Sequence, residues 1–151
     1  WYIPQKHPPI GTEDWNENPE HPVFVALRDF LDGYFAKKQA EADLLLAPAG
    51  TDFQRLIWGI LLQVPYGETI TYGELAARAA ELLQVPSMSA QAVGGAVGHD
   101  PITLMIPCHR VVGTNGSLTG YGGGIARKVK LLELERADMH GLFVPKKGTA
   151  L

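Results

Sequence analysis

Apolar and polar positions alternate along the first half of the chain with the period of α-helices. Residues 21–40 place large apolar side chains at helical spacing, so an amphipathic helix is predicted there. A second helix is predicted to begin at Thr51, because Thr51 and Gln54 have the spacing of a capping box. It should end before Pro65, since proline is excluded from helix interiors.

Two shorter helices are predicted next. Thr71 and Glu74 form a second capping-box pair, which starts a helix that runs to about Leu83. Another helix is expected over residues 90–98, with a serine before it as the cap. Two short helices joined by a brief polar turn fit a helix-turn-helix, and they fit an ordinary helical hairpin as well.

The remaining pattern adds little β-structure. Residues 102–106 are apolar and β-prone, which predicts a short buried strand or extended segment. Residues 114–117 have hairpin-turn chemistry, and residues 125–137 predict a final helix. The polar, proline-containing residues 1–20 are expected to be irregular, and residues 41–50 are typical of a linker. The predicted fold class is therefore α+β and mainly helical.

The charge is unevenly distributed along the chain. The whole sequence has 13 basic and 16 acidic side chains, for a formal net charge of −3. Residues 1–100 carry 6 basic and 13 acidic side chains, whereas residues 101–151 carry 7 and 3. A polyanion that binds this protein should therefore meet the carboxy-terminal third.

Several classes of protein are excluded by composition. With 1 cysteine the chain cannot form an intramolecular disulfide, which suits a reducing compartment and predicts a cytoplasmic protein. The longest apolar runs fall far short of the roughly 20 residues that a membrane span needs, and no signal segment opens the sequence, so no membrane association is expected. The 5 histidines are scattered, so no metal site is predicted.

The cysteine, Cys108, lies in a segment with several chemically suggestive neighbours. Pro107 restricts the backbone before it, His109 follows it, and Arg110 adds positive charge. A nearby histidine or cation lowers the pKa of a thiol and makes its reactive thiolate form more accessible. A lone cysteine is also often a small buried apolar residue, and the local sequence leaves both interpretations open.

Five collinear segments resemble the O6-alkylguanine-DNA alkyltransferase family, which repairs DNA. Residues 107–111, PCHRV, resemble its active-site motif, and residues 66–76 resemble the segment that opens its helix-turn-helix. Residues 92–96 are similar to its recognition helix, 120–124 to its active-site loop, and 128–135 to its last helix. The similarity thus spans nearly the whole second half of the chain.

The resemblance implies a role for each matching residue. Cys108 would accept the alkyl group, and His109 and Glu135 would form a water-linked relay that takes the thiol proton, as in a nucleophile–base–orienter triad. Tyr72 would donate a hydrogen bond to the departing guanine. Tyr121 would shape the pocket for a base flipped out of the duplex.

The resemblance also implies how DNA is bound. The recognition helix of the family enters the minor groove, which small side chains at Ala92, Gly94 and Gly95 would permit. Gln91, at the head of this helix, stands where the family commonly has an arginine that fills the gap left by the flipped base. Asp100 stands where asparagine is usual. The candidate phosphate contacts are Arg110, Arg127, Lys128 and Lys130.

The function implied is stoichiometric transfer of an alkyl group from O6-alkylguanine in double-stranded DNA to Cys108, by a monomer and without a cofactor. Residues 51–151 would be the DNA-binding and alkyl-acceptor domain, and residues 1–50 the remnant of an amino-terminal domain without its leading strands. Two alternatives are a non-catalytic, alkyltransferase-like lesion sensor, a type that lacks the acceptor cysteine, and a helix-turn-helix regulator with a structural cysteine.

Overall fold

The computed structural model describes residues 13–37 and 44–146, which fall into two compact units. Residues 48–146 form the larger unit, which contains every predicted site residue, and the rest form the smaller one. The predicted irregular residues 1–12 and the last five residues lie outside the described part. No helix in the described ranges is both long and apolar enough to cross a bilayer.

The smaller unit contains helix α1, Pro22–Phe35. His21 caps it, with Nδ1 accepting a hydrogen bond from the Val23 N–H at 3.3 Å. The predicted helix over residues 21–40 was too long at its carboxy end. Lys37 has a φ of 58°, a left-handed conformation that ends the helix, and residues 38–40 lie outside the described ranges. No strand occurs among the described residues of this unit.

Helix α2, Asp52–Leu61, opens the larger unit and confirms the predicted capping box. The Thr51 N–H donates to Gln54 Oε1 at 2.8 Å, and the Gln54 N–H donates to Thr51 Oγ1 at 3.2 Å. Trp58 is buried in the core and donates a hydrogen bond from Nε1 to the carbonyl of Ala96 at 2.9 Å. A side chain of α2 thus fixes the later helix that contains Ala96.

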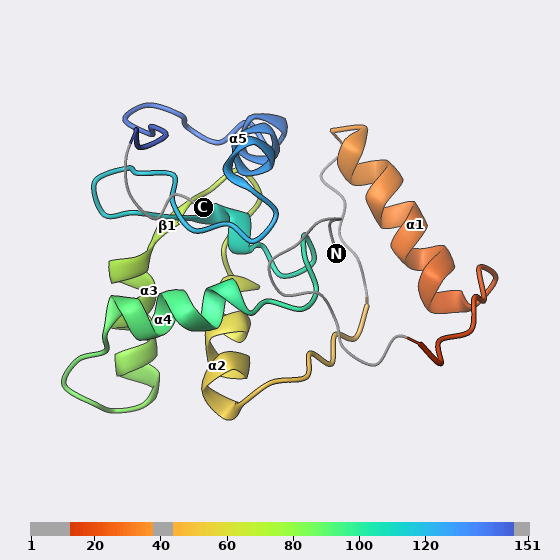
Figure 1. Ribbon diagram of the computed structural model, residues 1–151, viewed down its shortest axis with the longest axis horizontal. Coiled ribbons are helices and arrows are strands. Elements are labelled where there is room, and N and C mark those ends of the chain that lie inside the picture. The colour runs from red at the N-terminus through yellow and green to blue at the C-terminus, as the bar shows by residue number, and fades with distance from the viewer. Residues whose placement is uncertain (1–12, 38–43, 147–151) are drawn as a thin grey trace. The chain divides into compact units, whose positions relative to one another are not determined.

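That later helix is α4, Ala90–Gly98, and it pairs with α3, Tyr72–Leu82. Their caps, Thr71 and Ser89, are those predicted from the sequence. Helices α2, α3 and α4 pack against one another, and α4 runs across α3 (Figure 1). The apolar side chains buried in and beside these helices include Ile57, Ile60, Leu61, Leu75, Ala79, Val93 and Val97.

The described residues contain one small sheet, of two parallel strands. Strand β1, Ile70–Thr71, precedes α3, and strand β2, Val111–Val112, follows the cysteine segment. The strand predicted at residues 102–106 was wrong. Leu104 has a φ of 72°, which breaks the extended run, so the active-site strand is β2 instead.

A single 3-10 turn, η1 (Cys108–Arg110), leads directly into β2, and helix α5, Ile125–Leu134, packs against that turn. The predicted final helix reached residue 137, but the chain turns at Arg136, whose φ is 57°. The predicted turn before α5 is present. Its Gly116 has a φ of 84°, and a Cβ there would lie 2.1 Å from the Gly141 carbonyl oxygen. The fold is α+β and mainly helical, as predicted.

Candidate active site

Cys108 begins the 3-10 turn η1 and is buried, with 7% of its surface exposed. It lines a narrow cavity together with residues from three other segments. These are the end of α4, the loop that follows it, and the glycine-rich loop before α5, which supply Val97, Gly98, Asp100, Thr103, Tyr121, Gly122 and Gly123. Cys108 therefore borders this cavity while it stays almost hidden from bulk solvent.

His109 and Glu135 are in direct contact next to the cysteine. His109 Nε2 lies 2.8 Å from Glu135 Oε1, and neither side chain is exposed. The sequence implied a water-linked relay in which Glu135 orients the His109 imidazole, and this direct contact is suited to that orienting role. The other ring nitrogen, Nδ1, makes no hydrogen bond with any described residue.

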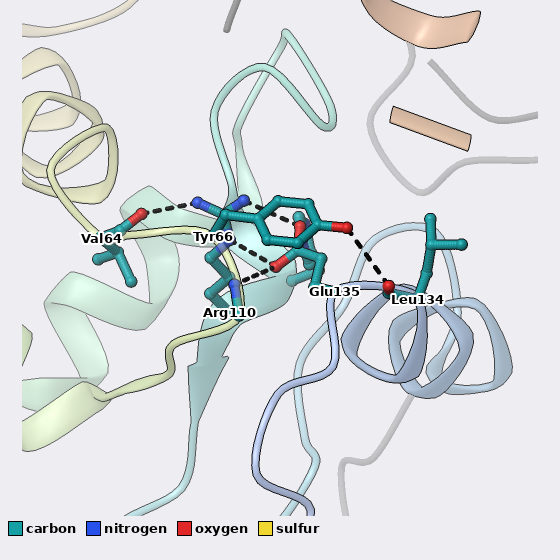
Figure 2. A network of polar contacts seen from close by, with 7 residues as sticks. Val64, Tyr66, Arg110, Leu134 and Glu135 are labelled. Atoms are coloured by element: carbon teal, nitrogen blue, oxygen red, sulfur yellow. Dashed lines mark hydrogen bonds and ion pairs between the residues drawn. The ribbon is translucent and has the colours of Figure 1, made fainter. Parts of the chain in front are cut away.

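Arg110 completes this buried network, as Figure 2 shows. Its Nη2 and Nε donate to the two oxygens of Glu135, each at 2.8 Å, and its Nη1 donates to the Val64 carbonyl at 2.6 Å. The guanidinium lies 5.9 Å from the centre of the Tyr66 ring, whose hydroxyl donates to the Leu134 carbonyl at 3.3 Å. Arg110 was predicted to contact phosphate, but in this structure its guanidinium is engaged by an internal carboxylate.

The network sets the protonation of its members. Burial alone would raise the pKa of Glu135, but hydrogen bonds from His109 and Arg110 outweigh it and hold that pKa well below its usual range. Burial lowers the pKa of His109, so the imidazole is neutral at pH 7. Because an ionised carboxylate can only accept, Nε2 carries the ring proton and Nδ1 is left with the free lone pair.

The thiol of Cys108 is held protonated. Burial raises its pKa well above the usual value, and the negative charge of Asp100 raises it further. The positive charge of Lys128 acts in the opposite direction without reversing the shift. Cys108 therefore needs a nearby base before it can react as a thiolate, rather than existing as a thiolate at rest.

Lys128 lies inside the protein, on the buried face of α5. Its ammonium group donates hydrogen bonds to the carbonyls of Val111 and of Thr119, the latter at 2.8 Å. Burial lowers its pKa to about 8. Lys128 was predicted to contact phosphate, but in this structure its ammonium group has internal carbonyl partners. Arg127 and Lys130, on the outer side of the same helix, are exposed.

Tyr72, the first residue of α3, lies close to the glycine-rich loop. Its hydroxyl donates to the Gly120 carbonyl at 3.2 Å, and a Cβ on Gly120 would lie only 2.7 Å from that hydroxyl oxygen. Burial raises the pKa of Tyr72 to about 12, with a further contribution from Cys108. Gly94 of α4 packs against the same ring, since a Cβ there would lie 3.6 Å from it.

Tyr121 is buried in the loop before α5 and lines the cavity beside Cys108. The centre of its ring lies 6.4 Å from that of His109, edge to face. The structure thus brings together all five residues predicted around the transfer site, which come from α3, η1, the glycine-rich loop and the end of α5.

The outer side of α4 is a second feature of the site. Gln91, Ala92 and Gly95 are exposed, and their spacing places them on one face of the helix. Nothing lies within 4 Å of a Cβ built on Gly95, whereas Val93 and Ala96 face the core. Apart from Gln91 this face has only small side chains, so another molecule could approach the helix backbone closely at Ala92 and Gly95.

Comparison with known proteins agrees with this arrangement. Residues 52–137 match the family model described as 6-O-methylguanine DNA methyltransferase, DNA binding domain. This chain belongs to that family. The resemblance found in the sequence is therefore confirmed.

Individual members of the methyltransferase family are similar over most of the chain. Proteins named methylated-DNA–protein-cysteine methyltransferase from Mycobacterium tuberculosis and Methanosarcina mazei are 47% and 44% identical to it. These alignments cover 89% and 83% of this chain, and 77% and 75% of the relatives. A crystal structure of M. tuberculosis OGT in complex with DNA has a TM-score of 0.76 and 44% identity, over 93% of this chain and 83% of that one.

Sequence patterns could have revealed one more feature of this family member. Leu131, Leu132 and Glu135 lie three, four and seven residues after Lys128, so all four residues share the buried face of α5 and its C-cap. Because the charged residues Lys128 and Glu135 lie on an otherwise apolar stripe, the pattern indicates that their side chains have hydrogen-bonding partners inside the protein. Asp100 was noted in the sequence only as a departure from the family, and no sequence pattern placed it in the cavity with Cys108.

No group of three or more histidine, cysteine, aspartate or glutamate side chains lies close enough to bind an ion, within residues 13–37 and 44–146.

Proposed function

We propose that Cys108 accepts an alkyl group directly from O6-alkylguanine in double-stranded DNA. The observation that carries the proposal is the position of a buried thiol in a cavity, adjacent to a buried histidine–glutamate pair. The Cys108 sulfur would attack the alkyl carbon, so that a C–S bond forms as the C–O6 bond breaks. The products are an S-alkyl cysteine and unmodified guanine, and the thioether ends the activity of that molecule.

The proton of the thiol has a defined route in this proposal. His109 Nδ1 has a free lone pair and accepts the proton, and the carboxylate of Glu135 stabilises the resulting imidazolium. The departing guanine gains one proton, which balances the one lost by Cys108. Tyr72 would exchange its hydrogen bond with the Gly120 carbonyl for one to the departing base. No cofactor takes part in these steps.

DNA would bind on the outer side of α4. The absence of bulky side chains at Ala92 and Gly95 suits insertion into a minor groove, and Gln91 would occupy the gap left by the flipped base. Gly94 would support this helix by packing against Tyr72. Exposed Arg127 and Lys130 are the remaining candidates for phosphate contacts, because Arg110 and Lys128 are used internally.

We further propose that residues 51–151 act as the DNA-binding and acceptor domain of a monomeric cytoplasmic protein, with residues 1–50 belonging to an amino-terminal domain. The charge pattern supports the first part, since basic side chains outnumber acidic ones after residue 100. The lone cysteine supports a reducing compartment.

The test is incubation with duplex DNA that contains O6-methylguanine, followed by peptide mass analysis. One methyl group should appear on the Cys108 peptide, in a ratio of one per protein molecule, and unmodified guanine should appear in the DNA. The Cys108→Ser variant should bind the same DNA without being methylated. An unmodified Cys108 peptide under saturating DNA would refute the proposal and leave a lesion sensor or a regulator as the function.

A further inference from the structure

Asp100 is a buried carboxyl group whose hydrogen bonding is incomplete. Only 6% of its surface is exposed. Its Oδ1 accepts a hydrogen bond from the Ile102 N–H at 2.9 Å, which fixes the orientation of the side chain. Its Oδ2 is buried and accepts no hydrogen bond from a nitrogen or oxygen of the described residues, and the nearest donor to the carboxyl is the thiol of Cys108, which is lost when Cys108 gives up its proton. A buried polar oxygen in this state is costly unless a bound group satisfies it.

The position of Asp100 indicates what that group would be. Asp100 and Cys108 line the same cavity. The charge of Asp100 acts on the thiol and raises the pKa of Cys108. No lysine or arginine is among the residues that line this cavity. Lys128 acts on Cys108 electrostatically, but its ammonium group donates to the carbonyls of Val111 and Thr119.

Any alkyl group about to be transferred to Cys108 must therefore lie beside an unneutralised carboxyl group. Burial raises the pKa of Asp100 to about 6, so the group is mostly ionised at neutral pH and can only accept hydrogen bonds there. A methyl group has no hydrogen-bond donor for this oxygen. A longer alkyl group with a terminal hydroxyl could donate to it, and one with a terminal carboxylate would be repelled.

We propose that Asp100 is a specificity-determining residue that favours alkyl groups with a hydrogen-bond donor and disfavours anionic ones. The inference rests on the proposed transfer to Cys108 and adds a substrate preference to it. For a 2-hydroxyethyl adduct the terminal hydroxyl would donate to Oδ2 while the carbon attached to O6 faces the sulfur. The bonds made and broken are the same as for methyl transfer, and no further reactant is needed.

The test measures single-turnover rates on three matched duplexes, with O6-methylguanine, O6-(2-hydroxyethyl)guanine and O6-carboxymethylguanine. The readout is the ratio of the hydroxyethyl rate to the carboxymethyl rate, because a general change in thiol reactivity or in folding cancels in it. The isosteric variant Asp100→Asn should reduce this ratio about tenfold or more, since it removes the charge. Asp138→Asn, which neutralises an exposed aspartate, should leave the ratio unchanged.

The wild-type protein offers a second readout that requires no variant. Acidification through about pH 6 protonates Asp100, so the same ratio should fall toward that of Asp100→Asn. The Asp100→Asn variant should show no such fall over the same pH range, which separates the titration of Asp100 from that of His109 or Lys128.

The outcomes separate the two proposals. Methyl transfer to Cys108 with a ratio that neither Asp100→Asn nor acid changes would overturn the specificity inference alone. No transfer to Cys108 from any of the three duplexes would overturn the proposed function and the inference with it.

Discussion

His109 and Glu135 form a hydrogen bond of 2.8 Å between Nε2 and Oε1, and solvent reaches neither side chain. The same carboxylate accepts hydrogen bonds from Nε and Nη2 of the Arg110 guanidinium. One side chain at the end of α5 therefore orients the imidazole and holds the 3-10 turn that contains Cys108. Glu135 contributes to reactivity and to stability, and different variants can measure the two contributions.

Glu135→Gln should slow methyl transfer at least about 100-fold, because an amide stabilises the imidazolium far less than a carboxylate does. The measurement is the single-turnover rate of methylation of Cys108, followed by mass analysis. Glu133→Gln is the matched control, since Glu133 is exposed on the same helix and should retain the wild-type rate. A wild-type rate for Glu135→Gln would exclude Glu135 from the proton route.

Arg110→Ala should lower the free energy of unfolding by about 3–5 kcal/mol, because it leaves the Glu135 carboxylate buried without its main ion-pair partner. Urea denaturation measures this change. The milder variant Arg110→Lys should bind DNA with the wild-type dependence on salt, since the Arg110 guanidinium bonds internally to Glu135 and Val64. A salt dependence reduced by about one counterion in Arg110→Lys would contradict the internal role.

The local and the long-range parts of this structure were predictable to different degrees. The starts of α2 and α3 were predicted correctly because a capping box depends on residues three positions apart. The contact between Arg110 and Glu135 was missed because it joins residues 25 positions apart, and no local pattern encodes which cation meets which carboxylate. As a result, Arg110 was assigned to DNA on charge alone.

The end of a helix and the path of a short strand were harder to predict for a related reason. Lys37, Leu104 and Arg136 all adopt a positive φ, which non-glycine residues rarely do. Only the surrounding tertiary structure makes such a conformation acceptable, so the sequence patterns extended α1, α5 and the strand at residues 102–106 too far.

Lys128→Met should abolish a pH-dependent part of the stability between about pH 8 and pH 10.5. Burial lowers the pKa of Lys128 to about 8, so over this range the unfolded chain holds a proton that the folded chain has released. Its contribution to the free energy of unfolding therefore rises with pH. The wild-type value minus that of Lys128→Met, from urea denaturation at each pH, should rise by about 3 kcal/mol. For exposed Lys130→Met the difference should stay flat.

Gln91→Arg should tighten binding to duplex DNA and increase its dependence on salt. Gln91 is exposed on the outer face of α4, so an arginine there would add one cation where the proposal puts the DNA. The slope of log affinity against log salt should steepen by about one, measured by fluorescence anisotropy at several salt concentrations. Gln63→Arg adds the same charge at an exposed position outside α4 and should change the slope less. Equal slopes for the two variants would mean that net charge, rather than the α4 face, governs binding.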